Sequence, residues 1–307
     1  GTRINYTVPG TISLFKKGAR EAKNLKAPFK EALIAVDTDW ASPALWRGME
    51  AASSKYTTEF YKVGTDNKLG DNGWERGGDK DRIYLYLFFK TFLVSGIITV
   101  ICLLLAFPVA HLLAVLPLSK ASLLMILVLL PFWTSLLVRT TAWIALLQEQ
   151  GIVNDALVGL GILSDENRLS MMYNMTGTIV AMTHVLLPFM ILPLYSVMKV
   201  IPPSYARAAR SLGATSWTTF RRVYLPQTLP GIAAGSLLVF ILAVGYYITP
   251  ALVGGAEGQL ISNLISFHMS KSNWSLAAAL AAMLLIAILA LYWIYDRLIG
   301  IDRLKLG

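Results

Sequence analysis

The sequence predicts an all-α membrane protein in which five transmembrane helices follow a polar N-terminal segment. Hydrophobic residues make up 55% of the 307 residues, charged residues make up only 15%, and the mean hydropathy is +0.58. A soluble domain carries about 25% charged residues. The charges are also unevenly distributed, since residues 1–83 hold 25 of the 45 and the other 224 residues hold 20. The chain therefore divides into a polar segment, 1–83, and a membrane domain, 84–307.

The membrane domain contains five apolar stretches, each long enough to cross a bilayer, which takes about 20 residues of helix. A buried helix of a soluble protein explains any one of them, but not five in one chain. Asp296, at the boundary of the last stretch, is the first Asp or Glu in any of them. The predicted spans are 84–115, 121–147, 176–199, 226–252 and 275–297.

Lysine and arginine residues in the short connections predict the orientation of the spans. The 116–120 turn, the 199–225 loop and the C-terminal segment together hold nine of them, whereas 148–175 and 253–274 hold two. We therefore expect the first set and the C-terminus to be cytoplasmic. Because these connections hold 11 of the 13 lysine and arginine residues of the membrane domain, the net charge of +9 does not indicate a nucleic-acid partner.

With five spans and a cytoplasmic C-terminus, residues 1–83 lie on the extracytoplasmic side. Long segments cross largely regardless of charge, but the basic run from Lys16 to Lys30 opposes unaided translocation. We therefore expect a sixth membrane helix before Gly1, in a bacterial inner membrane.

Two features stand out in the polar segment. Ser42 and Pro43 predict the start of a helix through about Lys55. Residues 70–78 read as a loop that lacks a phosphate-binding glycine motif. The segment either packs against the membrane domain or offers a docking surface to a partner.

The most informative connection is the predicted cytoplasmic loop 200–225. Pro202 and Pro203 end the preceding span, Ser204 can cap a short helix, and the alanine-rich residues 205–212 favour one. Gly213 suits the end of that helix, where a left-handed backbone is common. A second short helix is expected to run toward Pro226.

This loop resembles the "EAA" loop of ABC importer permeases, in which Glu-Ala-Ala, three residues, Gly, nine residues and Ile-x-Leu-Pro follow one another. Arg207 stands where the family often has Glu, which puts the family's usual charge contact with the ATPase in doubt but leaves the shape of the loop unaffected. The residues that match in order and spacing are Ala208, Ala209, Gly213, Val223, Leu225 and Pro226. Ser204, Tyr205 and Arg210 complete the candidate coupling loop.

The resemblance covers residues 84–300 and is greatest to permeases of the spermidine/putrescine type. It rests on four further segments, which are 131–143, Gly151-Ile152-Val153-Asn154, 187–195 and 247–255. It implies the type I ABC importer fold and a permease subunit without an ATPase site of its own. It also implies a second permease subunit, identical or paralogous, an extracytoplasmic solute-binding protein, and a cytoplasmic ATPase dimer that binds ATP and Mg²⁺. No cofactor is expected in this chain.

A group of aromatic and polar residues near the outer ends of the second and fourth spans is the candidate substrate pathway. Arg139 is the one strongly basic residue well inside a span, and buried charge in a bilayer is a functional hypothesis by default. It either pairs or extends toward the surface for structural reasons, or it lines the pathway. The same two alternatives, packing or pathway, apply to the aromatic residues. The candidates are Trp133, Arg139, Trp143, Tyr246, Tyr247 and Thr249.

The solute is less constrained than the fold. A polyamine follows from the resemblance, but the spans offer no carboxylate to a polycation, and Arg139 suits an opine, an amino-acid-like compound or another small anionic or zwitterionic solute better. An ATP-independent channel or secondary transporter is the alternative class. The three histidines lack metal-ligand spacing, so we expect no metal site.

Overall fold

The structure is a computed structural model that describes residues 2–5, 7–54, 57–78 and 82–299. It divides into two compact units. The first consists of residues 1–90 and 264–287, and the second of residues 91–263 and 288–307. Two long helices, α6 (Tyr84–Val115) and α16 (Trp274–Ile299), contribute residues to both units.

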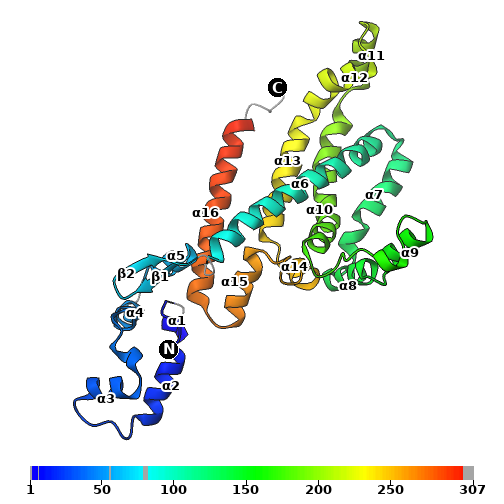
Figure 1. Ribbon diagram of the computed structural model, residues 1–307. Helices are drawn as coiled ribbons and strands as arrows, with labels where there is room; N and C mark the ends of the chain where they lie inside the picture. The colour runs from blue at the N-terminus through cyan, green and yellow to red at the C-terminus, as the bar shows by residue number, and fades with distance from the viewer. Residues whose placement is uncertain (1, 6, 55–56, 79–81, 300–307) are drawn as a thin grey trace. The chain divides into compact units, whose positions relative to one another are not determined.

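The first unit contains the polar segment, which forms short helices and one hairpin (Figure 1). Its remaining residues come from α15 (Ile261–Ser270) and from the first parts of α6 and α16. Its short elements are α1 (Thr2–Asn5), α2 (Thr11–Glu21), α3 (Phe29–Val36), the 3₁₀ turn Thr38–Ala41, α4 (Pro43–Ser53), α5 (Glu59–Gly64), β1 (Asn67–Gly70) and β2 (Gly73–Arg76).

The expected loop at 70–78 was wrong, because β1 and β2 form an antiparallel hairpin there. Gly70 pairs with Gly73, so only Asp71 and Asn72 lie between the strands. Gly73 has φ 123°, a value that side chains with a Cβ rarely adopt. The turn residues Asp71-Asn72-Gly73 between two short extended runs are a local hairpin signal.

The polar segment packs on the beginnings of two long helices. Phe60 and Val63 of α5 are buried against Leu276 and Leu280 of α16. The carboxylate of Asp66 accepts hydrogen bonds from the backbone N–H groups of residues 84 and 85, at 2.9 Å each, and so caps the start of α6. The packing alternative for this segment is therefore observed within the first unit.

The second unit holds the remaining helices around a core of α6, α10 and α13. Buried residues such as Ile98, Met190 and Val239 meet there. Its elements are α7 (Leu118–Trp133), α8 (Leu136–Leu147), α9 (Ile152–Gly159), the 3₁₀ turn Asp165–Asn167, α10 (Met175–Val200), α11 (Pro203–Ser211), α12 (Ser216–Thr219), the π turn Phe220–Tyr224, α13 (Leu225–Gly245) and α14 (Ile248–Val253).

Among the described residues, four helices are long and apolar enough to cross a membrane, and a bent pair raises this to five if it is counted as one span. The four are Tyr84–Val115, Met175–Val200, Ser216–Gly245 and Trp274–Arg297. The multi-pass all-α fold predicted from the sequence is confirmed, with corrections to two of the spans.

The predicted span 121–147 is bent, because the segments Leu118–Trp133 and Leu136–Gly159 lie at 99° to each other, and it counts as one span only if the two are taken together. The 16 residues of α7 rise only about 24 Å, which is less than the roughly 30 Å of a hydrocarbon core. Ser135 begins a new helix, its side chain accepting from the N–H of Val138. Hydropathy does not register such a break, since both arms are apolar.

The predicted span 226–252 is wrong at both ends. The helix begins at Ser216, so the second short helix expected in the cytoplasmic loop is continuous with the span. It ends at Gly245, and the short helix α14 follows after a break at Tyr246 and Tyr247.

A candidate coupling loop and transport pathway

The helix expected in the cytoplasmic loop is present as α11, and Gly213 ends it. The N–H of Gly213 donates to the carbonyl of Arg210 at 3.0 Å, and that of Ala214 donates to Ala209 at 3.1 Å. This pair of bonds, with φ 88° at Gly213, is the Schellman arrangement of a helix end. The left-handed turn predicted at this glycine is therefore observed.

The start of α11 differs from the expectation. Pro202 is the N-cap residue and Pro203 is the first helical residue, so Ser204 lies inside the helix and does not cap it. Two prolines remove two N–H groups that would otherwise lack partners. A side-chain cap is therefore less needed here than at most helix starts.

The loop presents an exposed surface made of small, aromatic and cationic side chains. Ala208 is exposed, as are Arg207 and Arg210. Leu212 is 89% exposed and Trp217 is 68% exposed. Apolar side chains of this size are seldom left open to water without a partner. The described chain thus leaves the outer face of α11 and α12 available for contact.

The second half of the matched motif lies in the π turn and the first turn of α13. Val223 and Leu225 are half-buried and Pro226 is exposed. The side chain of Gln227 donates to the carbonyl of Val223 at 2.7 Å, so this carbonyl has a side-chain partner in the turn before Pro226. A π turn accommodates a proline because the regular i to i−4 pattern is already interrupted.

Arg139 lies at the break between α7 and α8 and holds it together. Its Nη2 donates to the carbonyl of Thr134 at 3.0 Å and also to that of Pro131. The C-terminal carbonyls of α7 lack helical partners, and a guanidinium with several donors satisfies two of them at once. These hydrogen bonds give Arg139 structural partners, and its place on the pathway stays a prediction.

Three other pathway candidates, Tyr246, Tyr247 and Thr249, lie at a second break. The carbonyls of Tyr246 and Tyr247 accept hydrogen bonds from the side chains of Ser262 and Asn263, at 2.7 Å each. Thr249 follows in α14, where it is buried. The break is therefore supported by polar side chains of α15.

Trp143 is held by His184, which is not among the candidates predicted from the sequence. Its Nε1 donates to Nδ1 of His184 on α10 at 3.2 Å. The side chain packs in the same cluster as Leu147 and Val253, which joins α8 to α14. Trp133, at the end of α7, is 89% exposed and does not share this environment. Trp143 thus packs near Val253 at the end of α14, and Trp133 lies apart from this cluster.

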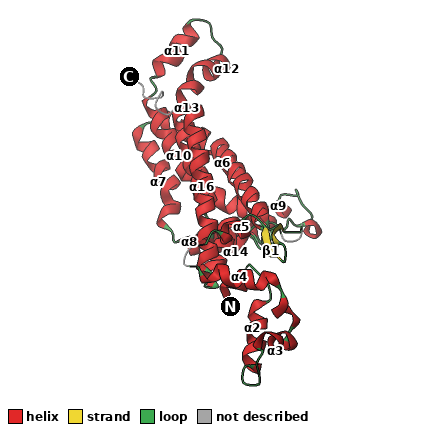
Figure 2. Cartoon of the chain, turned by 90° about the vertical axis from the view of Figure 1, so that its left-hand side faces the viewer, coloured by secondary structure: helices red, strands yellow, loops and turns green. Residues whose placement is uncertain are grey.

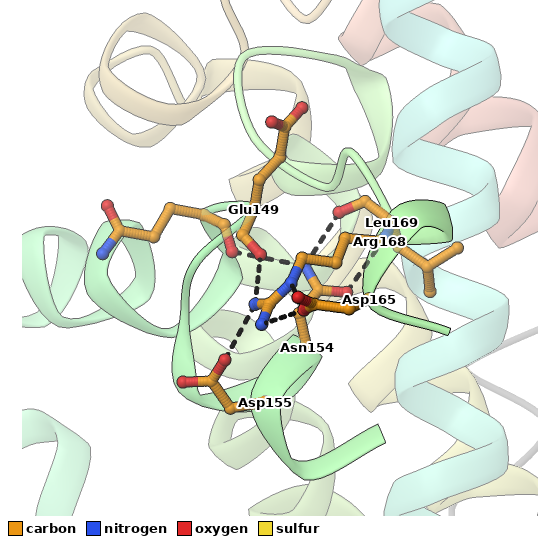
Figure 3. A network of polar contacts seen from close by, with 7 residues as sticks. Glu149, Asn154, Asp155, Asp165, Arg168 and Leu169 are labelled. Atoms are coloured by element: carbon orange, nitrogen blue, oxygen red, sulfur yellow. Dashed lines mark hydrogen bonds and ion pairs between the residues drawn. The ribbon is translucent and has the colours of Figure 1, made fainter. Parts of the chain in front are cut away.

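The connection after α8 is closed by a network of polar contacts (Figure 3). Arg168 donates to the carboxylates of Asp155 and Asp165, at 2.7 and 2.8 Å, and to the carbonyl of Glu149 at 3.0 Å. The hydrogen bond to Asp155, followed by that to Asp165, raises the pKa of the Arg168 guanidinium above its ordinary value.

Asn154 is the buried centre of that connection. It is 0% exposed, accepts from the N–H of Leu169 at 3.0 Å and donates to the carbonyl of the same residue at 2.9 Å. Gly151 precedes it where a Cβ would come within 2.8 Å of three backbone carbonyls. These contacts explain why the turn needs glycine at position 151 and asparagine at position 154.

The two candidate regions lie at opposite ends of the second unit. Figures 1 and 2 show α11 and α12 at one end, with α8, α9 and α14 at the other. The helices α10 and α13, which pack side by side, connect the two ends. A change at one end can reach the other only along such packed helices.

The chain is similar to several known proteins. Residues 76–299 match the family described as the binding-protein-dependent transport system inner membrane component. The spermidine/putrescine transport system permease protein PotB of Haemophilus influenzae is 38% identical over 216 residues, which are 70% of this chain and 75% of that protein. The protein of the same name from Escherichia coli is 35% identical over 224 residues, 72% of this chain and 81% of that protein.

The fold is similar to that of a chain in the crystal structure of a bacterial ABC transporter involved in the import of the acidic polysaccharide alginate. The TM-score is 0.62 at 17% identity, and the match covers 94% of this chain and 98% of that one. At this identity the likeness concerns the fold alone. The chain belongs to the family of binding-protein-dependent transport system inner membrane components, and it is a multi-pass inner membrane permease subunit of an ABC importer.

Proposed function

We propose that this chain is the permease subunit of an ATP-driven importer of a polyamine such as spermidine or putrescine. The observation that carries the proposal is the identity of 38% over 216 residues to a permease named for those solutes. In this proposal the chain itself hydrolyses no ATP, and a partner ATPase dimer binds ATP and Mg²⁺.

The coupling role is proposed for α11 and the residues up to Pro226. A ligand can shift a protein between two states only if it interacts differently with them. ATP acts on a partner, so its effect must enter the permease through a surface that the partner grips. The exposed face of α11, where Ala208 is small enough for close approach, supports that role, and so do Arg221 and Arg222 of the π turn, which are exposed and complement an acidic rim.

The pathway role is proposed for the candidates on the second and fourth spans, which have different roles. Arg139 keeps the break of the second span in shape and does not meet the solute directly. Trp133 and Tyr247 are exposed on this chain, and aromatic rings attract ammonium groups without a carboxylate. That attraction supports a polycation as solute even though the spans contain no carboxylate.

The remaining partners are proposed from the same family membership. They are a second permease subunit, which faces the exposed pathway wall, and an extracytoplasmic solute-binding protein, which delivers the solute. The orientation that puts α11 and the C-terminus on the cytoplasmic side follows from the distribution of lysine and arginine.

The test is reconstitution of the chain with its co-encoded partners in proteoliposomes. We expect uptake of labelled spermidine that requires ATP on the α11 side and the binding protein on the other, and co-purification with the ATPase. Uptake without ATP would establish a channel or secondary transporter instead. Uptake of an opine or another anionic solute in place of spermidine would overturn the polyamine assignment and leave the permease assignment in place.

A further inference from the structure

A cavity of about 680 Å³ lies at the base of the coupling loop, within the second unit. It is bounded by the ends of α6 and α10, by the first turns of α11, and by the π turn before α13. Its volume is in the range of small-molecule sites, which is about 300–1,000 Å³. The residues of the coupling motif alone did not suggest it, because its walls come from segments more than 100 positions apart.

The cavity is lined by three cationic side chains. They are Lys199 at the end of α10 and Arg207 and Arg210 on α11. The Lys199 ammonium donates to the carbonyl of Ala114 at 3.2 Å, and Nε of Arg210 donates to the carbonyl of Ala206 at 3.4 Å. Among the described residues, none of the three forms an ion pair with a carboxylate.

The absence of acidic partners has a cause in the sequence. The cavity is built from residues 111–115, 198–210 and 223–227, and the stretches 82–148 and 167–256 that contain them have no Asp or Glu. Three like charges around one cavity repel each other unless an anion lies between them. Charge compensation for this cavity must therefore come from outside these segments.

The lining of the cavity also includes other hydrogen-bonding side chains. His111 Nδ1 and the hydroxyl of Tyr224 are 2.8 Å apart, and Gln227 lies beside them. The first turn of α11 also opens here, with no acidic residue and no side-chain cap. Helix N-termini favour anions, so this turn adds to the field of the three cations.

We infer that this cavity binds a phosphate group, with the headgroup of an anionic phospholipid and free phosphate as its two sources. A phosphate accepts several hydrogen bonds at once and matches the arginine and lysine donors that line this cavity from two helices. The inference goes beyond the proposed function. One part rests on that function: a bound lipid would lie in the inner leaflet only in the orientation proposed above.

A bound phosphate has a mechanical consequence. It joins the end of α10, through Lys199, to the coupling helix, through Arg207 and Arg210. Since most residues of α11 are exposed, such a link restrains the helix relative to the membrane helices.

The test uses the purified full chain in neutral detergent and isothermal titration calorimetry. The probes are short-chain phosphatidylglycerol, glycerol phosphate, inorganic phosphate and short-chain phosphatidylcholine. The cavity variant replaces Lys199→Gln and Arg210→Gln together. The matched control replaces Arg221→Gln and Arg222→Gln, which removes the same charge from the same loop at positions that do not line the cavity.

We expect the cavity variant to weaken phosphatidylglycerol binding by about tenfold or more, as the loss of charge-assisted hydrogen bonds implies, and the control to change it less than about twofold. Tighter binding of phosphatidylglycerol than of glycerol phosphate identifies the lipid as the source, and equal binding of all anionic probes identifies free phosphate. A charge-preserving pair, Lys199→Arg with Arg210→Lys, should bind within about threefold of the parent, which separates loss of charge from misfolding.

Two results would overturn the inference. One is that the parent protein binds none of the anionic probes. The other is that the cavity variant and the control lose affinity equally, because that is general attraction to a basic surface. Neither depends on transport, so failure here is distinguishable from failure of the proposed function.

Discussion

At the scale of single residues, the polar side chains with the clearest roles are those that serve backbone groups where a helix starts or breaks. Asp66 caps α6, Arg139 satisfies carbonyls at the end of α7, and Asn154 closes the connection after α8. A buried backbone group that loses its partner costs free energy comparable to a lost hydrogen bond, so each of these side chains stabilises the chain at its helix start or break.

The first prediction concerns Arg139→Leu. The change leaves the carbonyls of Pro131 and Thr134 without their donor, which costs roughly 1–3 kcal/mol for each unsatisfied group. We expect a lower melting temperature of the purified protein together with reduced uptake. Arg139→Lys keeps the charge but not the fork of donors, and should lie between the two. Unchanged melting and unchanged uptake in Arg139→Leu would remove the residue from both structure and mechanism.

A second prediction at this scale compares neighbours on α9. Asn154→Ala removes three hydrogen bonds from a buried site, and we expect destabilisation of roughly 2–3 kcal/mol. Asp155→Asn removes one contact of an exposed carboxylate with Arg168, and we expect less than about 1 kcal/mol. Thermal melts of the two purified variants decide the matter. Equal shifts would show that burial of Asn154 has no special weight.

At the scale of elements, the coupling helix is defined by how it starts and ends. Two prolines begin α11 and a Schellman turn at Gly213 ends it, so its direction is set within 12 residues. The π turn Phe220–Tyr224 then joins the loop to α13 without a break in the helix. A force applied to α12 therefore reaches α13 through continuous helix, whereas α11 is joined to α12 by the turn at Gly213.

The third prediction is that Gly213→Val uncouples transport without preventing membrane insertion. A β-branched residue at φ 88° costs about 1–2 kcal/mol and misplaces the end of α11. Gly161 is a matched control, since it has φ 71° and, like Gly213, open space around it, but lies in the connection after α9. We expect ATP-driven uptake to fall in Gly213→Val, to persist in Gly161→Val, and to be largely kept in Gly213→Asn, which tolerates the left-handed region. Normal uptake by Gly213→Val would sink the coupling assignment.

At the scale of the whole molecule, the candidate functional regions and the polar segment fall in different compact units. The candidate coupling and pathway regions lie at the two ends of the second unit, whereas the first unit ties the polar segment to the starts of α6 and α16. A titrating group in the first unit should therefore change stability without altering the coupling surface.

The fourth prediction uses His268 of α15, which is buried and lies 3.4 Å from the hydroxyl of Tyr84. Burial lowers the pKa of this imidazole below its ordinary value of 6.5. The unfolded chain therefore binds the proton first as the pH falls. The stability contributed by the neutral ring is complete above about pH 6.5 and is lost as the pH drops from there toward the folded pKa.

Melting temperatures of the purified protein between pH 8 and pH 5 provide the measurement. We expect a plateau above about pH 6.5 and a decline below it, and a shallower decline in His268→Gln. An identical pH profile for parent and variant would show that this histidine is not the titrating group.

The sequence by itself determined the features that depend on neighbouring residues. Hydropathy located the spans near 84–115 and 175–200, and lysine and arginine distribution predicted their orientation. Proline, alanine and glycine placed α11 and its left-handed end, because helix propensity and backbone sterics act over a few residues. The hairpin at Asn72-Gly73 was equally local, so it could have been predicted as well.

Only the tertiary structure decided where helices break and which distant side chains meet. The 99° bend after Trp133 and the break at Tyr246 lie in apolar sequence, and a hydropathy profile carries no direction. Arg139 was visible as a buried cation, but its partners depend on that bend. His111 and Tyr224 are 113 positions apart, so the cavity between them and Lys199 exists only because α6, α10 and α13 pack together. Contacts of this kind come from the packing of whole helices, which no local pattern encodes.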